Sequence, residues 1–268
     1  MQPNPAPLTI VKLGGSVLTR KREEGKLRPK LVVRLSEEVA ASPGPLVLLH
    51  GAGSFGHPGA LRSGLAEPPT VDRTDARRRR AAVVVSSSVR RLHVAVLSAL
   101  TAAGVPAFSV PVGATAVNEG GRLSGFDPKP FAAALGRGLV PVSFGDVVLD
   151  ERWGYSILSA DTIVARLAIE LHAARVIFVS DVDGVLDSTH GSRPRSIPRV
   201  DERTLTDLLP RPGAPDVTGG IRGKLEVVLR LAEAGVDAGI ISGLRHGALS
   251  QALAGGVVHG SWAGPSFR

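Results

Sequence analysis

Short apolar runs alternate with helical patterns along most of the 268-residue chain, and this alternation constrains its fold more than any other feature. Leu46–Leu49 and Arg175–Val179 have the length of buried strands. The stretch 74–103 repeats apolar residues at spacings of three and four, which is typical of a helix. Strands that alternate with helices predict a mainly parallel sheet with helices on both faces. We therefore expect an α/β fold.

The apolar runs and their flanking glycines and prolines give approximate element bounds. The strands expected are 8–11, 46–49, 107–110, 140–143, 175–179 and 236–241, and the helices 30–40, 74–103, 131–135, 158–172 and 222–234. Residues 17–28 are expected to form a hairpin with Gly25 in its turn, and 188–220, rich in Pro, Arg and Gly, to be irregular and mobile. Residues 1–7 are expected to be a flexible tail. No long linker divides the remainder, which predicts a single domain over 8–268.

Composition excludes several classes of protein. The chain has no cysteine, so disulfides, thiolate metal sites and cysteine nucleophiles are ruled out. No apolar run approaches the ~18 residues of a membrane span, and no apolar targeting core precedes the first strand, which predicts a cytoplasmic protein without a membrane partner. The net charge of +8 admits a nucleic-acid partner, but an arginine-rich surface is the simpler explanation, and we expect none. The run Arg77–Arg80 is interpreted as a solvated face rather than a phosphate patch.

Lysine is scarce, since only six of the 32 basic residues are lysine. A lysine at a special position is then informative, because it supplies a compact ammonium instead of a planar fork. Lys12 comes directly after the first expected strand and before Gly14-Gly15-Ser16, where consecutive N–H groups form an anion nest. Lys224 ends a second glycine-rich run, 216–224, that leads into an expected helix. The start of a helix is a ready anion site.

Two further loops follow expected strands. Gly51, Gly53 and Gly56 fit the dinucleotide pattern G-x-G-x-x-G, and His50 and His57 bracket them. A histidine in a glycine nest can pair with phosphate, although an isolated histidine is more often a capping or core residue. The run 181–186 places acidic residues after a strand, where α/β folds bind ligands, or forms an ordinary Asp-Gly turn. Together the glycine-rich loops predict a ligand that carries several phosphates.

The order of these motifs resembles the isopentenyl phosphate kinase family, within the amino-acid kinase superfamily. The resemblance spans nearly the whole chain, in the segments VKLGGSVLTRK (11–21), HGAGSFGH (50–57), FGDVVLD (144–150), LSADT (158–162), SDVDGVL (180–186) and DVTGGIRGK (216–224). The K-x-G-G-S opening is shared by the superfamily, whereas the second histidine of the H-G-x-G-S-F-G-H run is specific to the family.

The resemblance implies a three-layer αβα sandwich around an open, mainly parallel sheet, usually in a homodimer. It implies an N-terminal lobe for the phosphate acceptor (about 8–170) and a C-terminal nucleotide lobe (about 171–268). The implied reaction converts an isoprenoid monophosphate, isopentenyl phosphate, and MgATP to isopentenyl diphosphate and ADP, in the alternative mevalonate route of isoprenoid biosynthesis. ATP and Mg²⁺ are the implied cofactors, with no metal ligand expected among the side chains.

The family's residue roles carry over to matching positions. Lys12, Lys21 and His57 are expected to be catalytic, with His57 on the substrate phosphate. The residues expected at ATP are Lys12, Gly14, Gly15, Ser16, Ala52, Gly53, Asp181, Asp183, Gly219, Gly220 and Lys224. The residues expected at the acceptor are Gly51, Gly56, His57, Asp146, Ser159 and Asp161. Apart from the resemblance, we expect the long helix near 81–89 to line the hydrocarbon pocket, where its alanines and serines would leave space for more than five carbons.

The sequence departs from the family pattern in two places. Ala52 stands where glycine is usual, and its methyl group is expected to tighten the nucleotide side. The run Ser159-Ala160-Asp161-Thr162 carries one carboxylate where the family usually has an acidic pair.

Other readings of the sequence stay open. One is another kinase of the superfamily, acting on fosfomycin or a small carboxylate. A dinucleotide-binding oxidoreductase would use Gly51–Gly56 with Asp72 or Asp75, but would leave 12–16 and 216–224 unexplained. A third is a non-catalytic ligand sensor or nucleic-acid binder, against which Lys12, Lys21, His57 and Lys224 argue together.

Overall fold

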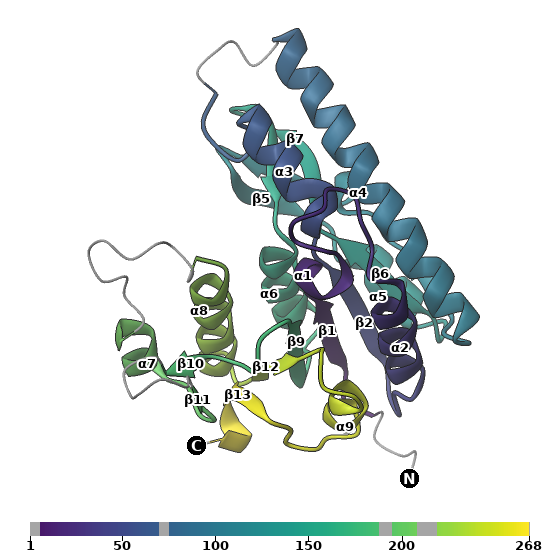
Figure 1. Ribbon diagram of the computed structural model, residues 1–268, viewed down its shortest axis with the longest axis vertical. Coiled ribbons are helices and arrows are strands. Elements are labelled where there is room, and N and C mark those ends of the chain that lie inside the picture. The colour runs from purple at the N-terminus through teal and green to yellow at the C-terminus, as the bar shows by residue number, and fades with distance from the viewer. Residues whose placement is uncertain (1–5, 70–74, 188–194, 208–218, 268) are drawn as a thin grey trace.

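The computed structural model describes residues 6–69, 75–187, 195–207 and 219–267. Within these residues, the largest sheet has seven strands in the order β13-β12-β9-β1-β2-β6-β3, and every neighbouring pair is parallel except β12 and β13 (Figure 1). The strands of this main sheet are β1 (Thr9–Leu13), β2 (Leu46–His50), β3 (Ala107–Ser109), β6 (Val140–Phe144), β9 (Arg175–Ser180), β12 (Asp237–Ser242) and β13 (Gly260–Ala263).

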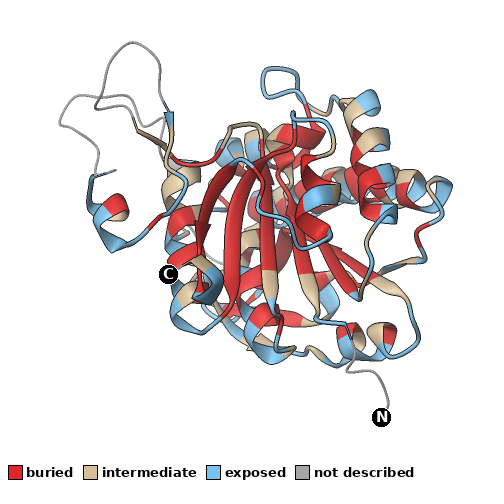
Figure 2. Cartoon of the chain, turned by 90° about the horizontal axis from the view of Figure 1, so that it is seen from below, coloured by how far each residue is buried: buried red, intermediate tan, exposed pale blue. Residues whose placement is uncertain are grey.

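Helices cover both faces of the main sheet, so its strands are buried from both sides (Figure 2). Successive strand residues point to opposite faces. Val11 and Leu48 pack in a core with α1, α2, α4 and α9, whereas Ile10 and Val47 pack in a core with α5, α6 and α8. The helices are α1 (Gly15–Leu18), α2 (Pro29–Ala40), α3 (Gly53–Ser63), α4 (Ala76–Ala102), α5 (Lys129–Leu135), α6 (Ala160–Glu170), α7 (Glu202–Asp207), α8 (Gly219–Glu233) and α9 (Ala248–Leu253). The expected three-layer α/β sandwich is confirmed.

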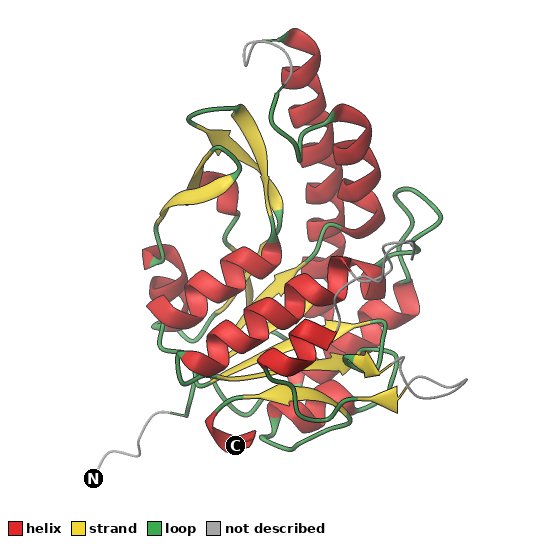
Figure 3. Ribbon diagram, turned by 90° about the vertical axis from the view of Figure 1, so that its left-hand side faces the viewer, coloured by secondary structure: helices red, strands yellow, loops and turns green. Residues whose placement is uncertain are grey.

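A second, four-stranded sheet was not predicted; it stands apart from the main sheet in Figure 3, and its order among the described residues is β5-β4-β7-β8. Its strands are β4 (Ala116–Glu119), β5 (Arg122–Phe126), β7 (Asp146–Asp150) and β8 (Gly154–Leu158). Buried Asp150 organises its turns by accepting hydrogen bonds from the N–H groups of Gly120, Gly121 and Trp153. Short strands β10 (Leu186–Asp187) and β11 (Arg195–Ser196) pair elsewhere, and 3₁₀ turns lie at Val112–Ala114 and Pro265–Phe267.

Helix α3 corrects the expectation of a glycine-rich loop over residues 50–57. Its sequence includes Gly53, Gly56 and Pro58, which all have low helix propensity. Tertiary contacts override that propensity, because Pro58 lacks the N–H that would bond to the Ser54 carbonyl, and the N–H of Gly25 donates to that carbonyl instead, at 3.1 Å. Gly25 belongs to the predicted hairpin, whose first two residues, Val17 and Leu18, are in fact the end of α1. The hairpin pairs only at the bridge between Thr19 and Leu27.

Other differences are local. Leu158 ends β8, so α6 begins later than expected, at Ala160. Part of the region expected to be irregular forms helix α7, and positions 188–194 and 208–218 of that region lie outside the described residues. Within the arginine run, Arg78 is buried and donates to the carbonyls of Gly64 and Tyr155, each at 3.0 Å, while its neighbours are exposed. Arg78 thus has a structural role, and the other arginines of the run form the solvated face that was expected.

Within the described residues, α4 is long and apolar enough, by length and composition, to cross a membrane, which the sequence reading did not anticipate. Its buried face carries Val89, Leu92 and Val96, which pack against α3 and the main sheet. The exposed face of the same helix carries arginines such as Arg91. One face of α4 is therefore buried in the fold, and the other is exposed.

Candidate active site

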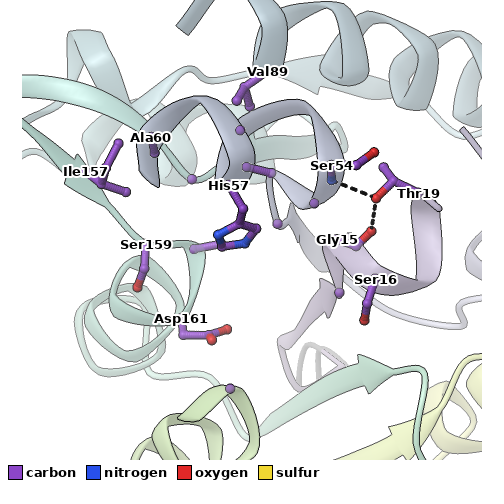
Figure 4. A pocket seen from close by; sticks show the side chains of 18 of the residues that line it. Gly15, Ser16, Thr19, Ser54, His57, Ala60, Val89, Ile157, Ser159 and Asp161 are labelled. Carbon is purple, nitrogen blue, oxygen red and sulfur yellow. Dashed lines mark hydrogen bonds between the residues drawn. The ribbon is translucent and has the colours of Figure 1, made fainter. Parts of the chain in front are cut away.

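A cavity of about 520 Å³ opens where β1, β2 and β9 end (Figure 4). The residues that follow these strands line it, and so do the first residues of helices α3, α6 and α8. Helix N-termini carry unpaired N–H groups and a partial positive charge. Several of them meeting at one cavity favour a ligand with negative charge.

Lysine side chains meet a carboxylate at the floor of this cavity. Buried Lys12, on β1, places its Nζ 2.9 Å from Asp161 Oδ1, and the Nζ of Lys224, on α8, lies 3.7 Å from Asp161 Oδ2. Lys224 also donates to the carbonyl of Gly220 at 2.8 Å. Burial raises the pKa of Asp161, but the two lysines more than offset it and hold the pKa below its ordinary value. Burial, together with the charge of Lys12, lowers the pKa of Lys224.

A second ion pair lies on the other side of the cavity. The Nζ of Lys21 is 2.8 Å from Asp181 Oδ2, and the hydroxyl of Ser16 donates to Asp181 Oδ1 at 2.7 Å. Burial raises the pKa of Asp181, and the hydrogen bonds from Lys21 and Ser16 bring it below its ordinary value. Lys21 is mostly solvent-exposed, so its ammonium group can leave Asp181 for an incoming anion at little cost.

His57 projects from α3 into the cavity, on the same side as Asp161 in Figure 4. The residue is exposed to solvent and lines the cavity. Partial desolvation by the surrounding protein lowers the pKa of His57, and the charges of Lys12 and Lys224 lower it further. The ring is therefore neutral near pH 7, with one N–H to donate.

The two N-terminal glycine loops are in direct backbone contact. A Cβ atom on Gly15 would lie 2.2 Å from the nitrogen of Gly53, so no side chain fits there. The hydroxyl of Thr19 joins the loops, because it donates to the carbonyl of Gly15 at 2.7 Å and accepts from the N–H of Ser54 at 2.9 Å. Sequence reasoning missed Thr19, since a lone threonine gives no signal. A Cβ atom added to Gly56 would lie only 2.5 Å from the Cβ of Ala52. The methyl group of Ala52 therefore faces Gly56 and packs against α3.

The end of the cavity beside α4 is apolar. Helix α4 contributes Val85 and Val89, as expected of this helix, but its alanines and serines do not line the cavity. The second sheet, which was not predicted, closes the same end. The apolar lining residues here are Pro58, Ala60, Val85, Val89, Val147 and Ile157.

Most of the predicted site residues line this cavity. Asp183 instead forms a two-pronged ion pair with Arg245, with both N–O distances 2.8 Å. Gly219 is the first residue of α8, at the limit of the described residues. Asp146 lines the cavity with its carboxylate buried against Arg90, at 3.2 Å, and burial raises its pKa. Ser159 caps α6 by accepting from the N–H of Thr162. Asp75, a candidate for nucleotide ribose, caps α4.

The carboxylates at the cavity suit a metal that arrives with its ligand. The described residues hold no cluster of three or more acidic, histidine or cysteine side chains. Asp161 and Asp181 are each neutralised by lysine. Mg²⁺ is commonly bound through one or two carboxylates plus substrate phosphates, so Asp181 and a polyphosphate together fit its coordination.

Comparisons with known proteins identify the family to which the chain belongs. The model of the amino acid kinase family matches residues 7–242. An isopentenyl phosphate kinase of Methanothermobacter thermautotrophicus is 38% identical over 95% of this chain and 98% of its own length. A crystal structure of an isopentenyl phosphate kinase superposes with a TM-score of 0.82, at 33% identity, over 95% of this chain and 99% of that one. A Thermoplasma acidophilum isopentenyl phosphate kinase, solved as a product complex, superposes with a TM-score of 0.77, at 26% identity, over 96% and 99%. The chain therefore belongs to the isopentenyl phosphate kinase family, within the amino acid kinase family.

Proposed function

We propose that this chain transfers the γ-phosphoryl group of ATP to isopentenyl phosphate, which gives isopentenyl diphosphate and ADP. One observation carries the proposal: a cavity lined by Lys12, Lys224 and His57 continues directly into an apolar end beside α4. A phosphate monoester with a short hydrocarbon tail matches both parts. Family membership supports the same reaction.

The chemistry needs positioning and charge neutralisation rather than a strong base. An oxygen of the acceptor phosphate is already ionised, and it attacks the γ-phosphorus as the bond to the β–γ bridging oxygen breaks. Lys12 and Lys21 neutralise charge on the moving phosphoryl group, and His57 donates a hydrogen bond to the acceptor phosphate. Asp161 acts through the lysines, because it pairs with both of them.

We propose that the two substrates occupy opposite lobes. The acceptor lobe, about residues 8–170, supplies His57 and the apolar end. The nucleotide lobe, about residues 171–268, supplies Asp181 and the start of α8. Gly14, Gly15 and Ser16 would wrap the ATP phosphates between the lobes, and Mg²⁺ would enter with ATP. We propose that the reaction takes place in the cytoplasm, where ATP is available.

We also propose a homodimer, formed through the outer face of α4. Val83 and Val94 are about 60% exposed on one stripe of this helix, and Phe108 is half exposed on the neighbouring edge strand β3. Exposed apolar side chains of this kind on one face are typical of an interface between subunits. Light scattering of the wild type and of Val94→Asp would test it: a dimer that becomes a monomer supports the interface, and a wild-type monomer refutes it.

The acceptor can be tested with a panel assayed by ADP release. Isopentenyl phosphate should be the best acceptor, isopentenol should be poor because it lacks the phosphate that His57 binds, and fosfomycin and N-acetylglutamate should be poorer still. A preference for fosfomycin or the carboxylate would refute the proposed acceptor while leaving a kinase of the same superfamily.

A further inference from the structure

A row of polar side chains connects the outer edge of the main sheet to the loop after β2. The hydroxyl of Ser109, on β3, lies 2.8 Å from His93 Nε2, and His93 Nδ1, on α4, lies 3.1 Å from His50 Nε2. At the end of the row, His50 Nδ1 lies 3.2 Å from the carbonyl oxygen of Gly51. Both histidines are buried and lie outside the cavity lining, so the proposed reaction does not use them directly.

Packing fixes the plane of each ring. The ring of His50 is nearly parallel to the rings of His93 and Phe144, with interplanar angles of 27° and 13° and centroid distances of 5.3 and 5.4 Å. His93 also packs against Phe144 at 4.3 Å. Rings held in this way cannot turn to find other partners, so the hydrogen bonds of the row are set by the fold.

The direction of these hydrogen bonds follows from the last acceptor. A carbonyl oxygen only accepts, so the proton of His50 is on Nδ1 and its Nε2 is an acceptor. Burial lowers the pKa of His50 to about 3 and of His93 to about 4, so each ring is neutral and holds one proton. His93 then donates from Nδ1 to His50, and its Nε2 accepts the hydroxyl proton of Ser109.

Hydrogen bonds fix both backbone polar groups of Gly51, and so they fix the orientation of the Gly51–Ala52 peptide. The N–H of Gly51 donates to the carbonyl of Leu13 at 2.9 Å, and its carbonyl accepts from His50. The described chain has no cis peptide bond, and in a trans peptide the N–H points opposite to the C=O. The N–H of Ala52 thus points away from the buried ring, toward the cavity that Gly51 and Ala52 line, and no described residue accepts a hydrogen bond from it.

We propose that Ser109, His93 and His50 form a one-way hydrogen-bond chain that aims the N–H of Ala52 at the transferred phosphoryl group. His50 and His93 are positioning residues for the reaction, and the inference rests on the proposed function. If the peptide turned over, the Gly51 carbonyl oxygen would face the phosphoryl oxygens and repel them. The chain of neutral rings prevents this without placing a charge beside Lys12.

The first test reads the proton positions without any activity. Long-range ¹H–¹⁵N NMR of histidine-labelled wild type, assigned with His50→Asn and His93→Gln, reports which ring nitrogen is protonated. His50 and His93 are both expected to carry the proton on Nδ1 throughout pH 6–8. A proton on Nε2 of His50 overturns the proposal, whether or not the chain is a kinase.

The second test measures kinetics. His50→Leu removes the donor to Gly51, and kcat should fall roughly 10- to 100-fold with a smaller change in the KM for the acceptor. His50→Asn keeps an amide N–H near the Nδ1 position, so most of kcat should return. Ser143→Ala is the matched control, because it removes another buried hydroxyl, bonded to Val110, without touching the chain.

The outcomes separate the possible failures. If His50→Leu lowers kcat no more than Ser143→Ala, or if His50→Asn restores nothing, the positioning role is wrong. If His50→Leu does not fold, the NMR result still decides. If the wild type has no kinase activity but both histidines carry Nδ1 protons, the proposed function fails and the hydrogen-bond chain stands.

Discussion

Lys12 and Asp161 form an ion pair at the floor of the cavity, with 2.9 Å between Nζ and Oδ1, and Lys224 approaches the other oxygen of the same carboxylate. The half-buried carboxylate of Asp161 thus holds the ammonium groups of Lys12 and Lys224 near each other. Without it, two like charges would repel each other in a poorly solvated place. When phosphate groups enter, they can take over the role of the carboxylate.

Asp161→Asn is therefore expected to reduce kcat, roughly 100-fold, because Lys12 loses its fixed position. ATP should bind at least as tightly, since the cavity becomes more positive. Steady-state kinetics and calorimetric ATP titration check both expectations. Glu170→Gln is the control, because it breaks the pair with Arg166 on the exposed side of the same helix. An Asp161→Asn enzyme with wild-type kcat would contradict the role given to this carboxylate.

Lys21 is expected to act in the transition state more than in binding. Lys21→Met should lower kcat roughly 100-fold while the Kd for ATP changes little, because the attraction between the ammonium group and the phosphoryl group strengthens as charge develops in the transition state. Lys21→Arg should restore little, since a planar guanidinium differs in shape. Arg20→Met removes a neighbouring exposed cation paired with Glu23 and should leave kcat unchanged. If Arg20→Met and Lys21→Met lower kcat equally, the overall positive charge near the cavity matters and the position of Lys21 does not.

Val89 is expected to limit the length of the acceptor's hydrocarbon tail. Val89→Ala enlarges the apolar end of the cavity, and the ratio of kcat/KM for geranyl phosphate to that for isopentenyl phosphate should rise about 10-fold, the value of one or two methylene groups in a pocket. Val96→Ala, on the same helix and equally buried but away from the cavity, should cost similar stability. If both variants leave the ratio unchanged, the tail lies elsewhere.

The buried histidines predict how stability depends on pH. In the unfolded chain a histidine gains its proton near pH 6.5, whereas folded His93 has a pKa of about 4 and folded His50 of about 3. Unfolding therefore takes up protons below pH 6.5, and the free energy of unfolding falls as pH is lowered from 6.5 toward 4. Urea titrations should show that His93→Gln flattens this slope, by up to about 1.4 kcal/mol per pH unit. An unchanged slope would show that His93 is charged in the folded state.

Much of the fold followed from the sequence because the main sheet is buried on both faces. Strands such as β2 and β9 are continuous apolar runs, and α4 repeats apolar residues with helical spacing. The second sheet escaped prediction because its strands are short and mix apolar with polar residues. Helix α3 escaped because packing, and the bond from Gly25 to Ser54, stabilise a sequence with low helix propensity.

The cavity could be predicted in outline, since glycine-rich loops after parallel strands must gather at one edge of the sheet. Contacts between distant residues could not. Nothing in the sequence pairs Asp183 with Arg245, joins Thr19 to Ser54, or connects Ser109 through His93 to His50, because these partners meet only in the folded chain. The roles of the individual site residues stay predictions, which the variants above test.

The most direct measurement is phosphorus NMR of the purified protein with MgATP and isopentenyl phosphate, beside His57→Ala. We expect the wild type to convert the monophosphate signal to the two signals of isopentenyl diphosphate, with ADP in equal amount, and His57→Ala to lose most of this conversion while still binding ATP. Intact ATP and isopentenyl phosphate in the wild-type sample would contradict the proposed reaction, and full conversion by His57→Ala would contradict the role of the histidine.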